Sequence, residues 1–267
     1  MKPRASLAPL IYVAIIMTPV YWLVVMSFKT NAEIAGQLTF FPHNPSLANY
    51  ALIFTDPDWY MGYVNAVIYV LLNVAISVAV ALPAAFAFSR YDFFGHRSLF
   101  FGLLMFRMMA PAILLAPFVQ IFSDLGLIDT HIAVALAHCF FNVPLAIWIL
   151  EGFISTVPRE MDESAAVDGH SLPGYIARIL VPQIAPGIAV AAFFCFMFSW
   201  IEYMLANALT TIDAKPIAGI MTRAAGVLSG DIALLSAASV LGLIPGLLLI
   251  IFVRKYLATG FSMGRVM

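Results

Sequence analysis

The sequence predicts an all-α, polytopic membrane protein with six transmembrane helices and both termini in the cytoplasm. Three observations support this prediction: an apolar composition, six long apolar segments, and a one-sided distribution of lysine and arginine. Hydrophobic residues make up 63% of the 267 residues and charged residues 10%, whereas soluble domains have about 45–50% and 25%. The net charge of −1 gives no indication of nucleic-acid binding.

Six segments are long and apolar enough to cross a bilayer, which takes about 20 residues each. They are Leu7–Phe28, Tyr63–Ser89, Leu99–Ser123, Ile132–Ile154, Val181–Met204 and Ile232–Val253. The first is longer than the apolar core of a signal peptide, so we interpret it as a retained helix. Several segments contain proline, which kinks a spanning helix and is tolerated where neighbouring groups satisfy the backbone.

Lysine and arginine determine the expected orientation, because they are enriched in cytoplasmic connections. One side of the predicted bundle collects Lys2, Arg4, Arg90, Arg97, Arg159, Arg178, Arg254, Lys255 and Arg265. The opposite side has Lys29, Lys215 and Arg223. We therefore expect residues 29–62 to form an outer loop and residues 155–180 a cytoplasmic loop within one transmembrane domain spanning residues 1–267.

The cytoplasmic loop after the fourth segment has the pattern of two short helices. Ser155 or Thr156 is expected to cap the first helix, and Gly169 is expected to end it in a left-handed turn. Residues 172–178 form the second, amphipathic stretch. An apolar stripe too short to span a membrane is expected on the first helix, made of Met161, Ala165 and Val167.

This loop resembles the EAA loop of binding-protein-dependent ABC importers, in which Glu-Ala-Ala is followed by three residues, Gly, nine residues, Ile, any residue, Leu and Pro. The positions that align with the pattern are Glu163, Ser164, Ala165, Gly169, Ile179, Val181 and Pro182. Ser164 and Val181 are conservative departures from it. The runs 126–130, 141–148 and 198–203 look like the carbohydrate-import branch, similar to the smaller maltose-permease subunit, with Ile201 where that branch usually has Asn.

The resemblance implies a permease subunit, not an enzyme, of an ATP-driven importer in the bacterial inner membrane. The family's coupling residues would be Glu163, Ser164, Ala165, Asp168, Gly169, Ile179 and Pro182. Implied partners are a second permease subunit (a different chain favoured over a second copy), two ATPase subunits, and a periplasmic or lipid-anchored solute-binding protein. The chain has no Gly-rich phosphate loop followed by Lys-Ser/Thr, so ATP and Mg²⁺ are expected on the ATPase partner. The expected solute is a small sugar or polyol, with glycerol-like compounds favoured.

Polar and aromatic residues inside the segments are candidates for the solute pathway: Arg107, Asn142, Trp200, Glu202, Tyr203 and Asn207. An ionisable group in a bilayer is costly and needs a reason. Arg107 either donates to solute hydroxyls or pairs with Glu151 on the next helix. Glu202 either lines the pathway or is hydrated at the interface. Asparagines in spans more often join helices, and Trp and Tyr near span ends are often interface anchors.

Two other classes of function are weighed against the permease. A multi-spanning membrane enzyme would need a catalytic motif such as His-Glu-x-x-His or Gly-x-Ser-x-Gly, and the sequence has neither. A proton-coupled carrier would need a buried acid relay, for which Glu202 is the one candidate. No metal site is expected, because His131 and His138 are seven residues apart and have no clear third ligand. Cys139 and Cys195 are expected to be apolar filler.

Overall fold

The computed structural model describes residues 7–36, 38–226 and 230–263. Within these ranges the regular structure is entirely helical. The chain divides into two compact units, Met1–Gly62 with Ile217–Leu247 and Tyr63–Pro216 with Leu248–Met267. Lys2, Arg4 and Arg265, which contribute to the predicted orientation, lie outside the described residues.

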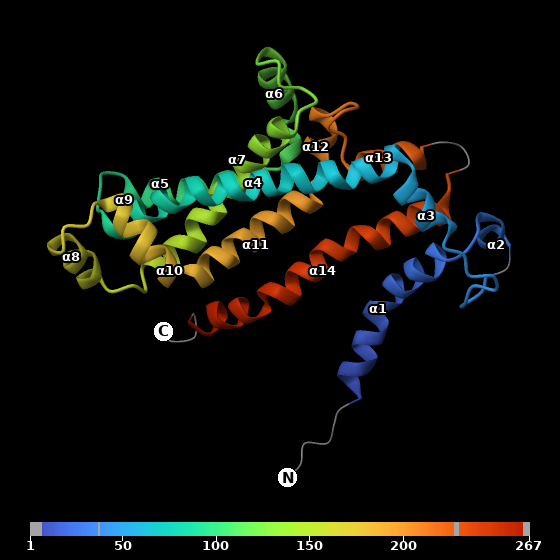
Figure 1. Ribbon diagram of the computed structural model, residues 1–267, viewed down its shortest axis with the longest axis horizontal. Helices are drawn as coiled ribbons and strands as arrows, with labels where there is room; N and C mark the ends of the chain where they lie inside the picture. The colour runs from blue at the N-terminus through green and yellow to red at the C-terminus, as the bar shows by residue number, and fades with distance from the viewer. Residues whose placement is uncertain (1–6, 37, 227–229, 264–267) are drawn as a thin grey trace, which may run out of the picture. The chain divides into compact units, whose positions relative to one another are not determined.

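The helices follow one another along the chain as labelled in Figure 1. Their bounds are α1 Ala8–Ser27, α2 Asn31–Ala35, α3 Ala48–Thr55, α4 Pro57–Arg90, α5 His96–Arg107, α6 Pro111–Asp124, α7 His131–Ile154, α8 Arg159–Val167, α9 Leu172–Tyr175, the π-helix η1 Ile176–Leu180, α10 Val181–Gln183, α11 Ala185–Ile201, α12 Met204–Leu209, α13 Ile217–Ala225 and α14 Ile232–Met263. Four helices, α1, α4, α7 and α14, are each long and apolar enough to cross a membrane. They correspond to the first, second, fourth and sixth predicted segments.

The third predicted segment is not one continuous helix. It consists of α5 and α6, whose axes are bent by 92° at the residues between them. Pro111 begins α6, and the residue before a proline is disfavoured in helical conformation. Accordingly, Ala110 is extended, with φ −68° and ψ 130°, and the chain turns there.

The fifth predicted segment is also broken. The stretch Leu172–Gln183 and the helix Ala185–Ile201 are bent by 84°, with Ile184 out of helical geometry at φ −91° and ψ 12°. Pro186 in the first turn of α11 has no N–H with which to continue the preceding helix. The described residues therefore contain four unbroken candidate spans, or up to six if each bent pair crosses as one.

The second unit packs around α7, and 67% of the apolar stretch of this helix is buried. Helices α5 and α11 contact α7, and α12 contacts both α6 and α7. Gly187 of α11 lies so close to Phe153 of α7 that a Cβ atom at Gly187 would be 2.4 Å from the ring. The buried Asn73 of α4 donates to the Ala135 carbonyl at 3.0 Å, which joins α4 to α7 by a polar contact.

The first unit contains α1, α2, α3 and α13, together with the beginnings of α4 and α14. Its polar contacts lie largely in the predicted outer loop. Lys29 is 4% exposed and donates to both the carbonyl and the hydroxyl of Thr39 at 2.7 Å. The amide of Ala233 at the start of α14 donates to the side chain of Asn31 at 3.0 Å. These contacts attach the outer loop to the last helix of the unit.

Candidate functional site

The loop between α7 and α11 begins with α8, which starts differently from the prediction. The residue before α8 is Pro158, and no side chain caps the helix. Ser155 instead donates to the Glu151 carboxylate at 2.7 Å, and Thr156 donates to a backbone carbonyl of α7 at 2.7 Å. The predicted cap is therefore wrong, because both hydroxyls are used to finish the last turn of α7.

One face of α8 packs against the rest of the second unit, and the opposite face is exposed. Ala165 is 4% exposed, and Met161 packs against the same buried cluster. Val167, expected on this apolar stripe, is 87% exposed. At 100° per residue, Met161 and Ala165 share a face, whereas Val167 points away from both. The predicted stripe is correct for its first two members and wrong for the third.

The predicted coupling residues divide into exposed and packed groups. Glu163, Ser164, Asp168 and Gly169 are exposed. Gly169 ends α8 with φ +80°, as predicted, and the following amide of His170 donates to the Ala165 carbonyl at 3.0 Å. Ile179, within the π-helix, packs against the buried cluster. Pro182 is exposed in α10.

Three side chains outside the predicted set tie α8 to the end of α4. Asp162 of α8 is 2.6 Å from Nε of Arg90, whose side chain is 6% exposed. The hydroxyl of the buried Tyr175 donates to the same carboxylate. Arg90 also donates to the Val157 carbonyl at 2.9 Å.

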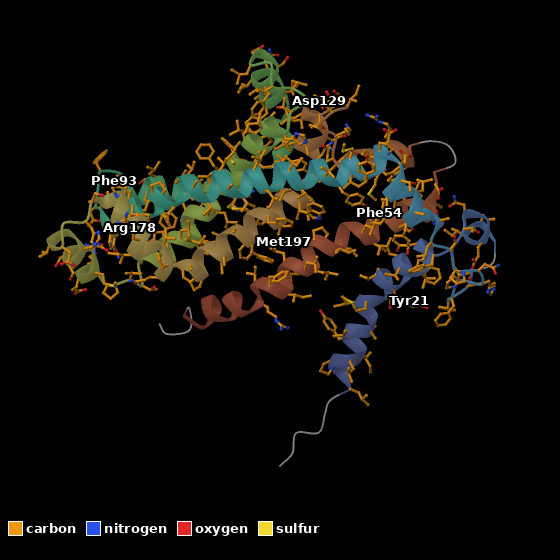
Figure 2. All side chains as sticks on the ribbon, in the orientation of Figure 1. Tyr21, Phe54, Phe93, Asp129, Arg178 and Met197 are labelled. Carbon is orange, nitrogen blue, oxygen red and sulfur yellow. The ribbon has the colours of Figure 1, made fainter. Side chains whose placement is uncertain are left out.

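We call Arg90, Asp162 and Tyr175 the loop clamp. In Figure 1, α8 and α9 lie together at the end of the second unit where α4 ends and α5 begins. Figure 2 places Arg178 and Phe93 at this same end. Opposite charges 72 residues apart in sequence give no local signal, so the sequence could not indicate this pairing.

A second feature is a cavity of about 630 Å³ within the second unit, at the break between α5 and α6 and against α7 and α11. Three of the six predicted pathway residues line it: Arg107, Asn142 and Glu202. Trp200, Tyr203 and Asn207 are not among its lining residues. The ring of Trp200 stacks on Phe196 at 5.8 Å between centroids.

Arg107 lines this cavity and does not pair with Glu151. Its guanidinium donates to the Phe141 carbonyl at 2.8 Å and lies over the Phe198 ring, 3.8 Å from its centroid. Phe141 and Glu151 are ten residues apart on α7, which is about 15 Å of helix rise. The alternative of an ion pair with Glu151 is therefore wrong, because Arg107 is held beside Phe141, far along α7 from Glu151.

Glu202 has a role that neither sequence hypothesis described. Its carboxylate accepts hydrogen bonds from the backbone amides at the start of α12, those of Met204, Leu205 and Ala206, at 2.9–3.3 Å. It also lies 3.0 Å from Nε2 of His138, and the other ring nitrogen of His138 is 2.6 Å from the hydroxyl of Ser199. Glu202 therefore caps α12 and joins it to α7.

Asn142 is 2% exposed and is only partly satisfied. Its amide nitrogen donates to the side chain of Asn73 at 2.7 Å and to the Cys195 carbonyl at 3.2 Å. Its side-chain oxygen is buried and has no hydrogen-bond partner among the residues that the structure describes. A buried acceptor in this condition is rare and needs an explanation.

Asp129 organises the loops that lie away from α8. It has φ +62°, and its carboxylate accepts hydrogen bonds from the hydroxyl and amide of Thr211 and from the amides of Ile212, Asp213 and Ala214. Burial alone would raise the pKa of Asp129, but these hydrogen bonds hold it well below its ordinary value. Figure 2 shows Asp129 beside α6 and α12. The run 126–130 carries no local signal of this role, because the partners of Asp129 lie 82–85 residues later in the chain.

His131, Cys139 and Cys195 lie in polar or buried contacts within the second unit. Nε2 of His131 is 2.9 Å from the side-chain oxygen of Asn65. Cys139 and Cys195 are buried free thiols, in keeping with the prediction of apolar filler. In the part of the chain that the structure describes, no group of three or more His, Cys, Asp or Glu side chains could hold a metal ion.

Comparison with known families and proteins gives consistent matches over most of the chain. Residues 59–262 match the family described as binding-protein-dependent transport system inner membrane component. The sulfoquinovosyl glycerol transport system permease protein SmoH of Agrobacterium fabrum is 28% identical over 269 residues, covering 98% of this chain and 93% of the relative. The trehalose transport system permease protein SugB of Mycobacterium tuberculosis is 27% identical over 254 residues, covering 94% and 92%.

Solved structures with the same fold also exist. A chain from the crystal structure of a bacterial ABC transporter involved in the import of the acidic polysaccharide alginate aligns with a TM-score of 0.78 and 20% identity, covering 92% of both chains. A chain from an alginate transporter in complex with its pentasaccharide-bound periplasmic protein aligns with a TM-score of 0.60. At these identities, the match shows the fold.

Proposed function

Because the chain belongs to the family of binding-protein-dependent transport system inner membrane components, we propose that it moves a small sugar or polyol across the membrane and that α8 couples it to a separate ATPase. It is a membrane-embedded translocation subunit of an ABC importer, not an enzyme. The resemblance to carbohydrate-type importer permeases is confirmed by its relatives.

The observation that carries the coupling proposal is the exposed face of α8. This helix has nine residues, too few to cross a membrane, and it presents Glu163, Asp168 and the apolar Val167 outward. Ala165 and the loop clamp hold the opposite face against the rest of the second unit. An anchored helix with two free carboxylates and a free apolar side chain suits docking into a cleft with basic groups on an ATPase partner, where ATP and Mg²⁺ are bound.

We propose the rest of the assembly from the predicted orientation and the family. The chain crosses the bacterial inner membrane six times, each bent pair counting as one span, with both termini and α8 on the cytoplasmic side. A second, different permease chain completes the pathway, two ATPase subunits dock below, and a periplasmic or lipid-anchored binding protein delivers solute. Residues 29–62 and 205–231 face that protein; 37 and 227–229 lie outside the described residues.

The solute class rests on the relatives and on the cavity. Relatives carry names of transport systems for sulfoquinovosyl glycerol, diacetylchitobiose and trehalose, which are hydroxylated solutes. The cavity lined by Arg107, Asn142 and Glu202 has a size within the usual range of small-molecule sites. Glycerol-like polyols remain the favoured members of this class. Trp200, Tyr203 and Asn207 remain candidates for other parts of the pathway.

The test of this proposal measures the ATPase activity of the complete complex in liposomes, with saturating binding protein and a panel of sugars and polyols. The Glu163→Lys variant should lose solute-stimulated ATP hydrolysis, because it reverses an exposed charge in the docking face. Gly169→Pro should do the same, because proline cannot adopt the φ of +80° found there. Asp124→Lys, which reverses an exposed charge at the end of α6 outside this loop, is the control and should retain most of the stimulation.

Assembly is followed by co-purification of all subunits. Stimulation in the wild type that disappears in both coupling variants, with assembly intact, supports the proposal. Stimulation that survives in Glu163→Lys and Gly169→Pro would show that α8 is not the coupling element. A wild-type complex that none of the sugars or polyols stimulates would refute the solute class.

A further inference from the structure

The cavity of the second unit contains two kinds of polar group, and only one kind has unused hydrogen-bonding capacity. Glu202 and His138 are fully engaged with each other, with Ser199 and with the start of α12. Asn142 has a buried side-chain oxygen without a partner. Among the described residues Arg107 donates one hydrogen bond, to the Phe141 carbonyl, whereas a guanidinium has five N–H donors.

The unused groups are complementary: one is an acceptor and the other a donor. A buried acceptor without a partner costs about 1–3 kcal/mol. Turning the Asn142 amide toward the cavity that this residue lines would expose its oxygen, so a molecule that donates a hydrogen bond to it is favoured there. The same molecule must offer an acceptor to the guanidinium of Arg107. A hydroxyl does both, and two neighbouring hydroxyls can serve the two residues at once.

The remainder of the lining suits the other part of such a molecule. Phe141, Trp148 and Phe198 contribute aromatic side chains, and Phe198 also holds the guanidinium of Arg107 in place through its ring. Aromatic surfaces pack against the C–H face of a saccharide or polyol while its hydroxyls point elsewhere. The volume of about 630 Å³ is within the range of about 300–1,000 Å³ for ligand sites.

We infer that this cavity is a solute subsite in which Arg107 and Asn142 bind adjacent hydroxyls of a neutral saccharide or polyol, while the Glu202–His138 pair builds the wall without contacting solute. The inference rests on the proposed transport function and adds which residues recognise the solute. It also places part of the solute site in this subunit. Glu202 is a positioning residue, because its oxygens are occupied by the backbone of α12 and by His138.

The first test compares two arginines on α5. In the complete complex in liposomes, uptake and stimulated ATP hydrolysis are measured with glycerol, maltose, trehalose and, as an acidic probe, glucuronate. Arg107→Met should reduce uptake of the neutral probe that the wild type prefers by roughly 10- to 100-fold, the loss expected for a hydrogen bond from a charged donor. Arg97→Met makes the same change at an exposed position outside the cavity and should match the wild type. If Arg107→Met does not assemble, Arg107→Gln, which keeps an N–H donor, replaces it.

The second test separates the acceptor from the helix contact. Asn142→Ala and Asn73→Ala both remove the hydrogen bond between these two residues, but only Asn142 lines the cavity. Asn142→Ala should therefore change the order of preference among the four probes, whereas Asn73→Ala should leave that order as in the wild type. Melting temperatures of both variants report the shared loss of the interhelical contact.

The outcomes separate the subsite from the transport function. Preserved import of a neutral probe by both Arg107→Met and Asn142→Ala would overturn the subsite and leave the importer intact. A wild type that imports glucuronate but none of the neutral probes would show that Arg107 serves an anion, which also overturns the inference. A wild type stimulated by none of the four would overturn the subsite together with the proposed solute class.

Discussion

The loop clamp gives the sharpest prediction for the mechanical connection between α8 and the membrane helices. The change is Asp162→Asn, which keeps the shape of the side chain and removes its charge. Arg90 would then be left with a 6% exposed side chain and no anionic partner. Removing one partner of a buried ion pair costs about 3–5 kcal/mol. Since the Asp162 side chain is 23% exposed and Arg90 keeps the Val157 carbonyl, we expect about 2–3 kcal/mol.

Two measurements follow from this magnitude. The apparent melting temperature of the purified complex should fall by roughly 5–10 °C. The number of ATP molecules hydrolysed per solute imported should rise, because α8 would move with less effect on α4. Glu160→Gln is the matched control on the exposed first turn of α8 and should shift stability by no more than about 0.5 kcal/mol.

A double-mutant cycle decides whether the effect comes from this pair. Arg90→Met and Asp162→Asn should each destabilise the complex, and the double variant should be less destabilised than the sum of the two, because the second change removes an unpaired charge. Strictly additive losses, or a stability of Asp162→Asn equal to that of Glu160→Gln, would refute the reasoning.

Three further predictions concern packing and the outer loops. Gly187→Ala should destabilise the protein by about 1–3 kcal/mol, because its Cβ would lie 2.4 Å from the Phe153 ring of α7. The control Gly152→Ala, whose Cβ would have nothing within 4 Å, should be neutral or stabilising. Equal melting temperatures for the two variants would contradict the close packing at Gly187. Asp129→Gly, which removes every carboxylate contact while tolerating positive φ, should speed hydrogen exchange of the amides at 211–214, and unchanged exchange would exclude the anchor. Because its pKa is lowered in the folded state, the stability Asp129 contributes is present above pH about 4 and lost as the pH falls further, a loss that the Gly variant should not show in acid melts. Asn73→Leu should cost about 0.6–1.7 kcal/mol, the range for polar contacts between spanning helices, as measured by thermal melting.

The amino-acid sequence determined the features that depend on local composition and spacing. Apolar length is sufficient to locate helices α1, α4, α7 and α14, since a backbone in lipid must satisfy its own hydrogen bonds within the segment. The turn at Gly169 follows from the conformational freedom of glycine next to a short amphipathic stretch. The spacing from Glu163 to Pro182 was likewise sufficient to indicate the family.

Tertiary structure decided which side chains meet. Apolar length cannot reveal that the third and fifth segments bend by 92° and 84°, because a proline permits a bend while neighbouring helices set its angle. The sequence left open whether Arg107 faces solute or pairs with Glu151, and the packing around Arg107 puts its guanidinium at Phe141 and Phe198. Contacts between residues far apart, such as Asp129 with the loop 82–85 residues later, depend on which helix faces come together. That choice is made by the burial and close packing of whole helices, and no local pattern records it.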